Sequence, residues 1–234
     1  MEKCSHLLVT EPELYHGRWQ SLFCGNQNSL VNQRRVLAAG INESPSGADP
    51  GEPSRFELHV EIGCGKGRFT VETAKAAEAA LRTRDGFFMV ALEKSADAMV
   101  IALERAAAEG LRNIKFINAF ADDLTEYFAP GEVSCIYLNF CDPWPSNRHA
   151  KRRLTNRRFL ELYMQVLNTG GEIRFKTDNL PLFEYSLHEF EYAGFTLTDV
   201  DRDLHGDGPA EIMTDYEIKF HSQGSPIYKC VYRK

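Results

Sequence analysis

The hydrophobic positions of this chain follow two different spacings, and from residue 56 onward the two alternate. Short runs rich in β-branched and aromatic residues predict strands, whereas longer stretches with apolar residues three or four positions apart predict helices. The expected strands are Phe56–Ile62, Phe87–Leu92, Asn113–Asn118, Val133–Phe140, Glu172–Lys176, Thr196–Val200 and Pro226–Tyr232. The expected helices are Arg68–Leu81, Asp97–Ala108, Arg158–Leu167, Leu182–Tyr192 and a short one around Asp215–Phe220. Gly110 and Gly194 directly follow two of these helices and are expected to end them.

The order of these elements predicts the fold class. Strands that alternate with helices favour an α/β fold, in which helices cover both faces of a largely parallel sheet. Val133–Phe140 is an almost unbroken apolar run, so it is expected at the centre of that sheet. The last two strands flank the short helix, an order typical of a sheet that ends in an antiparallel pair. We therefore expect seven strands, mostly parallel.

The length and composition indicate one domain with an extension at its N-terminus. A chain of 234 residues with 43% hydrophobic residues is long enough to bury a sizeable core. Residues 56–234 form the expected core, and residues 1–55 the extension, in which Trp19 and Phe23 are candidates to pack against the core. Residues 42–54 are rich in proline, glycine and acid without a hydrophobic period, which predicts a mobile surface loop.

Several classes of protein are disfavoured by what the sequence lacks. It has no run of about 18 apolar residues and no signal pattern at the N-terminus, so neither a membrane span nor secretion is expected. We therefore expect a cytoplasmic protein. Its six cysteines form no C-x-x-C pair, so we expect no metal site and no dithiol redox motif. Cys135 lies in an apolar strand pattern, which favours a small buried hydrophobe over a nucleophile.

Three glycines in alternation follow the first expected strand, in the stretch Glu61–Gly67. Glycine lets the backbone turn sharply and approach a ligand closely, so the pattern predicts a loop that holds a nucleotide-like cofactor. The dinucleotide fingerprint would need glycine or alanine at position 68, where this chain has Arg68, and this disfavours a pyrophosphate. The alternative is a strand-to-helix turn that binds nothing.

Polar residues end the successive strands, where ligands of doubly wound sheets collect. Those residues are Glu61, Glu93, Asn118, Asp142 and Asp178. Glu93 has the position of an acid that accepts both hydroxyls of a ribose, although a charge at the start of the next helix is a competing interpretation.

The loop after the fourth strand, Asn139–Pro145, combines a carboxylate, two prolines and a tryptophan. Prolines fix the backbone, so the acid and the indole are held in set positions that suit a flat substrate. A basic block follows, and it consists of Arg148, Lys151, Arg152, Arg153, Arg157 and Arg158. Because phosphate attraction acts within a Debye length of about 8 to 10 Å, this block can bind a polyanion although the net charge is −6. A solvated basic face is the alternative.

Three motifs together resemble the bacterial tRNA (guanine-N7)-methyltransferase family. They are Asp142-Pro143-Trp144-Pro145 with the basic run Arg148–Arg153, then Phe175–Asn179, then Asp203–His205 with Ile212–Glu217. The resemblance covers nearly all of the chain from Phe56 onward, and Gly17–Trp19 also looks familial. It implies a Rossmann-like enzyme that transfers a methyl group from S-adenosylmethionine to N7 of guanosine 46 in the tRNA variable loop. S-adenosylhomocysteine would be the product, and we expect a monomer or homodimer without an obligate partner subunit.

The resemblance also implies roles for single residues. Cofactor contacts are expected from Glu61, Gly63, Gly65, Glu93, Asn118, Ala119, Phe120 and Asp142. Asp142 is the expected catalytic residue, and substrate contacts are expected from Ser146, Asp178, Thr214, Asp215, Tyr216 and Glu217. RNA contacts are expected from Arg148, His149, Lys151, Arg152 and Arg153, although His149 fits an ordinary loop histidine equally well.

The sequence departs from the family pattern at several places. Many relatives have an acid where Phe120 stands, and some have lysine where Ser146 stands, so both contacts are open. Residues 30–54 have no counterpart in compact relatives. Two rivals remain at this point: another nucleic-acid methyltransferase, acting on an exocyclic amine or a different guanosine, and a noncatalytic RNA-binding module. Trp144 between the prolines disfavours the first, because enzymes for exocyclic amines often carry two adjacent prolines there.

Overall fold

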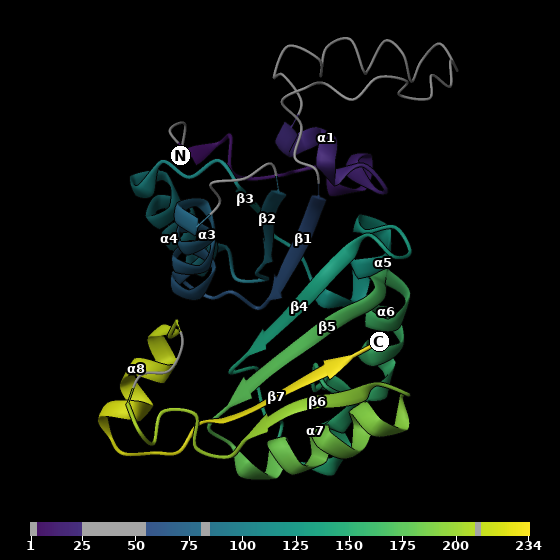
Figure 1. Ribbon diagram of the computed structural model, residues 1–234, viewed down its shortest axis with the longest axis vertical. Coiled ribbons are helices and arrows are strands. Elements are labelled where there is room, and N and C mark those ends of the chain that lie inside the picture. The colour runs from purple at the N-terminus through teal and green to yellow at the C-terminus, as the bar shows by residue number, and fades with distance from the viewer. Residues whose placement is uncertain (1–3, 25–54, 81–84, 209–211) are drawn as a thin grey trace.

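One seven-stranded sheet organises the protein, in the order β3-β2-β1-β4-β5-β7-β6 (Figure 1). The computed structural model describes residues 4–24, 55–80, 85–208 and 212–234, so the predicted loop at 42–54 lies outside the described residues. The strands are β1 (Arg55–Ile62), β2 (Asp85–Leu92), β3 (Ile114–Ile117), β4 (Val133–Asn139), β5 (Leu167–Thr177), β6 (Thr196–Asp201) and β7 (Tyr228–Arg233). Only β7 opposes its neighbours, so the mostly parallel sheet with an antiparallel end is confirmed.

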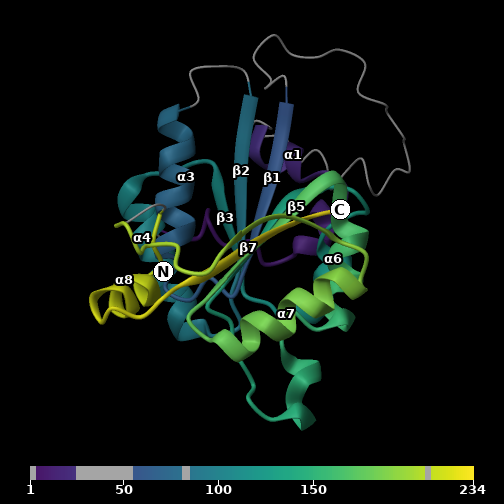
Figure 2. The ribbon, with the colours of Figure 1, turned by 60° about the horizontal axis from the view of Figure 1, so that its bottom comes forward.

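Helices cover the sheet on two sides (Figures 1 and 2). The α-helices are α1 (Trp19–Cys24), α3 (Arg68–Ala80), α4 (Ala96–Glu109), α5 (Leu124–Tyr127), α6 (Arg157–Val166), α7 (Leu180–Tyr192) and α8 (Asp215–Ser222). Short 3-10 helices span Pro12–Tyr15, Ala121–Asp123 and Asn147–Arg152. The helices α3 and α4 pack on one face of the sheet, and α5, α6 and α7 pack on its other face, where α7 covers β5, β6 and β7. The helix α8 lies apart from both layers, beside the strand ends.

The central position predicted for the fourth strand is confirmed. The strand β4 pairs in parallel with β1 on one side and β5 on the other. Six of its seven residues are buried, because helices cover both of its faces. Its carboxyl end therefore opens in the middle of the sheet, where the change in strand order leaves room for a ligand.

The boundary between α6 and β5 differs from the prediction. We expected the helix to include Leu167 and the two glycines that follow to separate it from a strand at Glu172–Lys176. Instead β5 begins directly at Leu167, which pairs with Val133. Gly170 has φ +79°, so it produces an irregularity within the strand rather than a loop before it. Pairing between strands thus overrides the local glycine signal.

The N-terminal segment packs into the same core as the sheet. Trp19 is fully buried, stacks on Phe128 with 5.3 Å between ring centroids, and donates its indole N–H to the carbonyl of Tyr127 at 2.9 Å. Glu132 also accepts the backbone N–H of Trp19 at 3.1 Å. Such a tryptophan anchors the N-terminal segment, because a large apolar area is buried while the indole N–H keeps a hydrogen-bond acceptor.

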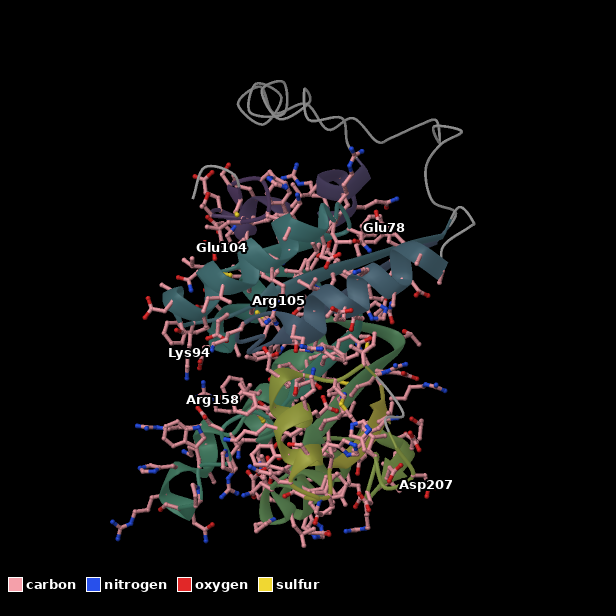
Figure 3. All side chains as sticks on the ribbon, turned by 90° about the vertical axis from the view of Figure 1, so that its left-hand side faces the viewer. Glu78, Lys94, Glu104, Arg105, Arg158 and Asp207 are labelled. Atoms are coloured by element: carbon pink, nitrogen blue, oxygen red, sulfur yellow. The ribbon has the colours of Figure 1, made fainter. Side chains whose placement is uncertain are left out.

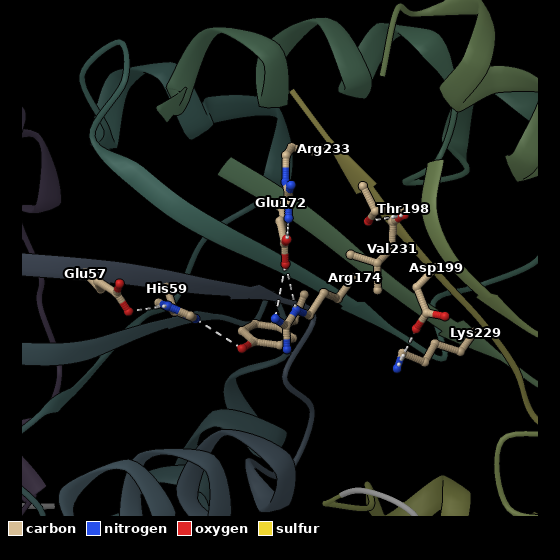
Figure 4. A network of polar contacts seen from close by, with 10 residues as sticks. Glu57, His59, Glu172, Arg174, Thr198, Asp199, Lys229, Val231 and Arg233 are labelled. Carbon is tan, nitrogen blue, oxygen red and sulfur yellow. Dashed lines mark hydrogen bonds and ion pairs between the residues drawn. The ribbon is translucent and has the colours of Figure 1, made fainter. Parts of the chain in front are cut away.

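His59 is held neutral inside a polar network on the sheet face (Figure 4). Its Nδ1 lies 3.0 Å from the hydroxyl of Tyr137, and its ring packs against Phe87 with 4.3 Å between centroids. Burial, together with the smaller effect of the nearby Arg174 guanidinium, lowers the pKa of His59 to about 3. The folded protein therefore resists protonation of this ring.

Acid should destabilise the protein through His59. The folded pKa lies below the unfolded value of 6.5, so the contribution is intact above pH 6.5 and is lost as the pH falls towards 3, where the unfolded chain binds one more proton. The loss is about 1.4 kcal/mol per pH unit, or about 2 kcal/mol by pH 5. Urea unfolding at pH 7 and pH 5 should show a larger drop for the wild type than for His59→Gln. Equal drops in the two proteins would contradict this assignment.

Candidate active site

The glycine loop after β1 turns under the end of β2. The backbone N–H groups of Gly63 and Cys64 both donate to the carbonyl of Leu92, at 2.8 and 3.0 Å. Gly63 and Gly65 have φ +80° and +55°, and a Cβ added at either would meet no atom within 4 Å. Gly67 differs, because its Cβ would lie 2.7 Å from that of Ala102. The first two glycines thus face open space, and the third allows α3 and α4 to approach.

Glu93 braces this loop from the end of β2. Its Oε2 accepts the N–H of Gly65 at 2.9 Å, and its Oε1 accepts the N–H of Ser95, the residue that caps α4, at 2.8 Å. Glu93 is largely buried, yet part of it lines a cavity at the carboxyl ends of the strands. Each carboxylate oxygen can accept a second hydrogen bond, so the bonds at the start of α4 leave acceptor capacity for a ligand.

A cavity of about 600 Å³ opens at the carboxyl ends of the strands. Predicted site residues that line it are Gly63, Gly65, Glu93, Ala119, Phe120, Asp142, Lys151, Arg152 and Tyr216. The loop after β3 is attached to the β2 end, because the Asn118 side chain donates to the carbonyl of Glu93 at 2.7 Å. Asn118 itself does not line this cavity, whereas Phe120 is 59% exposed on its wall.

The Asp142 loop has an unusual backbone. Phe140 and Trp144 have φ +51° and +40°, the only non-glycine residues in the described ranges with positive φ. Such conformations cost of order 1–3 kcal/mol each and persist only where surrounding structure imposes them. Asp142 projects between them with its side chain 67% exposed, and its Oδ2 lies 3.8 Å from Nζ of Lys94. The strain therefore places a solvent-accessible carboxylate on the cavity wall.

Arg153 holds this strained loop in place. Its guanidinium donates to the carbonyl of Pro143 at 3.0 Å and to that of Trp144 at 2.9 Å, and it stacks over the ring of Tyr185 at 4.3 Å. Arg153 is only 7% exposed. The structure thus argues against the RNA contact expected of Arg153, because its donors already bind backbone carbonyls. Its role is to position the loop that carries Asp142.

The other expected RNA contacts lie at the surface beside the cavity. Arg148, His149, Lys151 and Arg152 are exposed on the short 3-10 helix that follows the Asp142 loop. The guanidinium of Arg152 lies over the Trp144 ring at 4.8 Å. Lys94 and Arg158 also line this cavity, and Figure 3 labels both side chains. Arg158 is ion-paired with Asp122.

A second cavity of about 310 Å³ adjoins the first. The two share Gly63, Gly65, Ala98, Phe140 and Tyr216 as wall residues. Glu61 lies at the back of the smaller one, where its carboxylate accepts hydrogen bonds from Thr70 and from Asn139 Nδ2, the latter at 3.0 Å. Burial raises the pKa of Glu61 despite these donors.

Asn139 is a site residue that the sequence analysis did not assign. Its Oδ1 is buried without a hydrogen-bond partner, and the residue lines the smaller cavity. An unpaired buried acceptor costs about 1–3 kcal/mol, so this oxygen beside the cavity is a candidate acceptor for a donor on a ligand. The signal was its position at the end of β4, three residues before Asp142.

The remaining expected substrate residues are distributed unevenly. Tyr216 and Asp215 line the smaller cavity from α8, and Asp215 pairs with Arg105 at 3.2 Å. Ser146 is exposed and caps the short 3-10 helix, accepting the N–H of Arg148 at 3.3 Å. Asp178 follows β5, is partly exposed, and lines neither cavity.

Thr214 and Glu217 form the start of α8. The Thr214 hydroxyl accepts the N–H of Glu217 at 3.0 Å, and the Glu217 carboxylate accepts the N–H of Thr214 at 2.7 Å. Thr214 lines the smaller cavity, whereas Glu217 is completely buried. The expected contact between Glu217 and the substrate remains a prediction.

Two negative findings apply to the described parts of the chain. No group of three or more histidine, cysteine or acidic side chains within them is arranged to hold a metal ion. No helix there is long and apolar enough to cross a bilayer. Cys135 is buried, and burial raises the pKa of its thiol to about 12, as expected of a packed side chain rather than a nucleophile.

Comparisons with known proteins decide the family. A family model described as "Putative methyltransferase" matches residues 56–230. A tRNA (guanine-N(7)-)-methyltransferase of Geobacillus kaustophilus (strain HTA426) is 42% identical over 224 residues, which cover 95% of this chain and 87% of the relative. The chain belongs to the tRNA (guanine-N7)-methyltransferase family. A second member, from Geobacillus sp. (strain WCH70), is 41% identical over 95% of this chain and 86% of its own length.

Solved structures share the fold of this tRNA (guanine-N7)-methyltransferase family member. An antibiotic-related methyltransferase superimposes with a TM-score of 0.58 at 16% identity, covering 78% of this chain and 90% of its own. An S-adenosylmethionine-dependent methyltransferase from Aquifex aeolicus gives 0.51 at 14% identity, covering 90% and 94%. At these identities the likeness concerns the fold alone, and it confirms the predicted Rossmann-like architecture.

Proposed function

We propose that this enzyme methylates N7 of guanosine 46 in the variable loop of tRNA. As a member of its family, the chain methylates guanine N7 in tRNA and takes the methyl group from S-adenosylmethionine. One observation carries the proposal. The exposed carboxylate of Asp142 lines the same cavity as the glycine loop, and exposed arginines and a lysine lie beside that cavity. The proposal places the enzyme in the cytoplasm, as a monomer or homodimer without an obligate partner subunit.

The two cavities fit the two halves of the cofactor. Glu93 would hold the ribose beside the open faces of Gly63 and Gly65, and Ala119 and Phe120 would contact the adenine. In the smaller cavity, the unpartnered Oδ1 of Asn139 suits the α-ammonium group of the methionine half. When bound, the cofactor supplies an electrophilic methyl group on a sulfonium.

Positioning carries most of the catalytic work in this proposal. Guanine N7 has an in-plane lone pair and needs no deprotonation before it attacks a methyl group, so no general base is required. Holding two reactants in line can lower a barrier by roughly 7–11 kcal/mol at best. Asp142 accepts the N1 and N2 hydrogens of guanine and stabilises the positive charge that the purine gains. Arg153 keeps that carboxylate in place through the carbonyls of Pro143 and Trp144.

Phosphate binding by the exposed basic residues predicts a difference in salt dependence. Lys151→Ala should weaken tRNA binding and flatten the slope of log affinity against log salt by about 0.7–0.9, because one phosphate contact is lost. Arg153→Lys is the matched comparison, since a lysine keeps the charge but cannot span both carbonyls. It should lower kcat and leave the salt slope unchanged. Binding measurements at several salt concentrations check this, and a flattened slope for Arg153→Lys would contradict its buried role.

Identification of the product tests the proposed function directly. The purified protein is incubated with S-adenosylmethionine and unmodified tRNA, and the digested RNA is searched for methylated nucleosides by mass spectrometry. We expect 7-methylguanosine with the wild-type tRNA and none with a tRNA whose guanosine 46 is replaced by adenosine. 7-Methylguanosine from the replaced tRNA would move the target elsewhere, and a different methylated nucleoside would overturn the proposed chemistry.

A further inference from the structure

The helix α8 contributes to both cavities although it lies apart from the two helical layers (Figure 1). Tyr216, its second residue, lines both cavities, and its ring lies nearly parallel to that of Phe140 with 6.2 Å between centroids. Tyr216 is 60% exposed, so its own packing contacts do little to fix its position. Something else must hold the start of α8 beside the strand ends.

Exposed ion pairs contribute part of that attachment. Asp215 lies 3.7 Å from Arg68 on α3 and 3.2 Å from Arg105 on α4. All three side chains are about a third or more exposed, and surface pairs of this kind stabilise a structure only weakly. These pairs alone therefore do not determine the position of the helix.

A buried cluster lies beneath the same turn of α8. The Oε1 atom of Glu217 lies 2.9 Å from Nζ of Lys176, on β5, and 3.1 Å from Nε2 of His205, on the loop after β6. The exposed fractions of these residues are 0% for Glu217 and 3% for each partner. Lys176 also donates to the carbonyl of Ile212, just before α8, at 3.2 Å. One carboxylate thus joins three separate segments of the chain.

The cluster is also connected to the cavity floor. The carbonyl of Lys176 accepts the N–H of Phe140 at 2.9 Å, so the residue that fixes Glu217 also fixes the ring partner of Tyr216. Both oxygens of Glu217 accept hydrogen bonds, Oε1 from the cluster and Oε2 from the Thr214 N–H. A completely buried carboxylate with these partners holds the start of α8 against β5 and the loop after β6.

We infer that Lys176 and His205 are positioning residues, which act through Glu217 to hold Tyr216 against Phe140 at the boundary of the two cavities. The inference rests on the proposed function, because it assigns the boundary formed by Tyr216 to the cofactor site. It predicts that substitutions in the cluster weaken cofactor binding, and that this loss can be measured in the absence of tRNA.

The test measures S-adenosylhomocysteine binding by calorimetry without tRNA. Glu217→Gln has only one side-chain acceptor, so it cannot serve both the cluster and the helix cap, and affinity should fall about tenfold, as for loss of one hydrogen bond to a charged group. Tyr216→Ala should also weaken binding. In the double variant, the effect of Glu217→Gln should largely disappear, because its action passes through Tyr216. Full additivity of the two losses would overturn the inference.

Variants of His205 separate positioning from general loss of structure. His205→Gln keeps an N–H donor near the Nε2 position and should retain most of the affinity, whereas His205→Leu should lose it. This pair also covers the case in which Glu217→Gln fails to fold. Equal affinity of His205→Gln and His205→Leu would overturn the role of that donor. Glu184→Gln, which removes an exposed ion pair with Arg202, is the control and should bind as the wild type does.

The outcomes distinguish this inference from the proposed function. If Glu217→Gln lowers kcat with tRNA while S-adenosylhomocysteine affinity is unchanged, Glu217 contacts the substrate and the inference fails alone. If the wild type binds S-adenosylhomocysteine but produces a nucleoside other than 7-methylguanosine, the proposed function fails and the binding results still decide the inference. Tight binding by the wild type with losses in the cluster variants supports it.

Discussion

Asp142→Asn should lower kcat by roughly two to three orders of magnitude, the size of effect seen when one electrostatic contact to a transition state is removed. The substitution keeps the shape of the side chain but removes the negative charge that we propose stabilises the cationic purine. Asparagine also presents two donors where guanine N1 and N2 need acceptors. The affinity for tRNA should change little, because phosphate contacts supply most of it.

Single-turnover rates and tRNA dissociation constants measured on the same preparations check this prediction. Asp122→Asn is the matched comparison, since that acid lines the same cavity but is paired with Arg158. Its loss of kcat should be much smaller. Equal losses in turnover and in tRNA affinity for Asp142→Asn would contradict the catalytic role, because they would indicate an ordinary binding contact.

Gly67→Ala should destabilise the fold more than an equivalent change at any glycine that faces open space. Its φ of +74° is strained for alanine, at a cost of roughly 1–2 kcal/mol. The new methyl group would also lie 2.7 Å from Cβ and 3.0 Å from Cα of Ala102, so α4 must move. Overpacking of this kind adds about 1–3 kcal/mol. We expect a total loss of roughly 2–5 kcal/mol in the free energy of unfolding.

Gly110→Ala is the control for strain alone. Gly110 ends α4 with φ +67°, and an added Cβ would meet nothing within 4 Å. Urea unfolding should therefore show a loss of only about 1–2 kcal/mol for this variant. If Gly67→Ala were no less stable than Gly110→Ala, the close approach of α3 and α4 would not be the reason for the glycine.

The sequence predicted the site best for residues whose position along the chain, at the end of a strand or in the glycine loop, fixes their position in the fold. Glu61, Glu93 and Asp142 lie at or just beyond the carboxyl ends of β1, β2 and β4, and parallel strands bring these ends to one edge of the sheet. Periodicity located those strands, so the acids could be grouped before any contact was known. The glycine alternation identified the loop between β1 and α3 in the same way, because positive φ is a local requirement.

The sequence did not predict the direction in which individual side chains point. Arg153 stands in a run of basic residues, yet it points inward to the carbonyls of Pro143 and Trp144 while Lys151 and Arg152 remain exposed. A charge pattern cannot distinguish these cases, because the distinction depends on which carbonyls the strained loop leaves without partners. The start of β5 at Leu167 was missed for a similar reason, since pairing with Val133 is a contact between distant segments.

The sequence by itself determined the fold class, the glycine loop after β1 and the acids near the strand ends, because each follows from local backbone requirements and from the period of burial. Only the tertiary structure decided which polar groups are exposed and which are committed to neighbours. The acceptor of Asn139 without a partner and the cluster of Lys176, Glu217 and His205 exist because β4, β5, the loop after β6 and α8 meet at one place. Burial and pairing depend on that meeting, which sequence spacing does not specify.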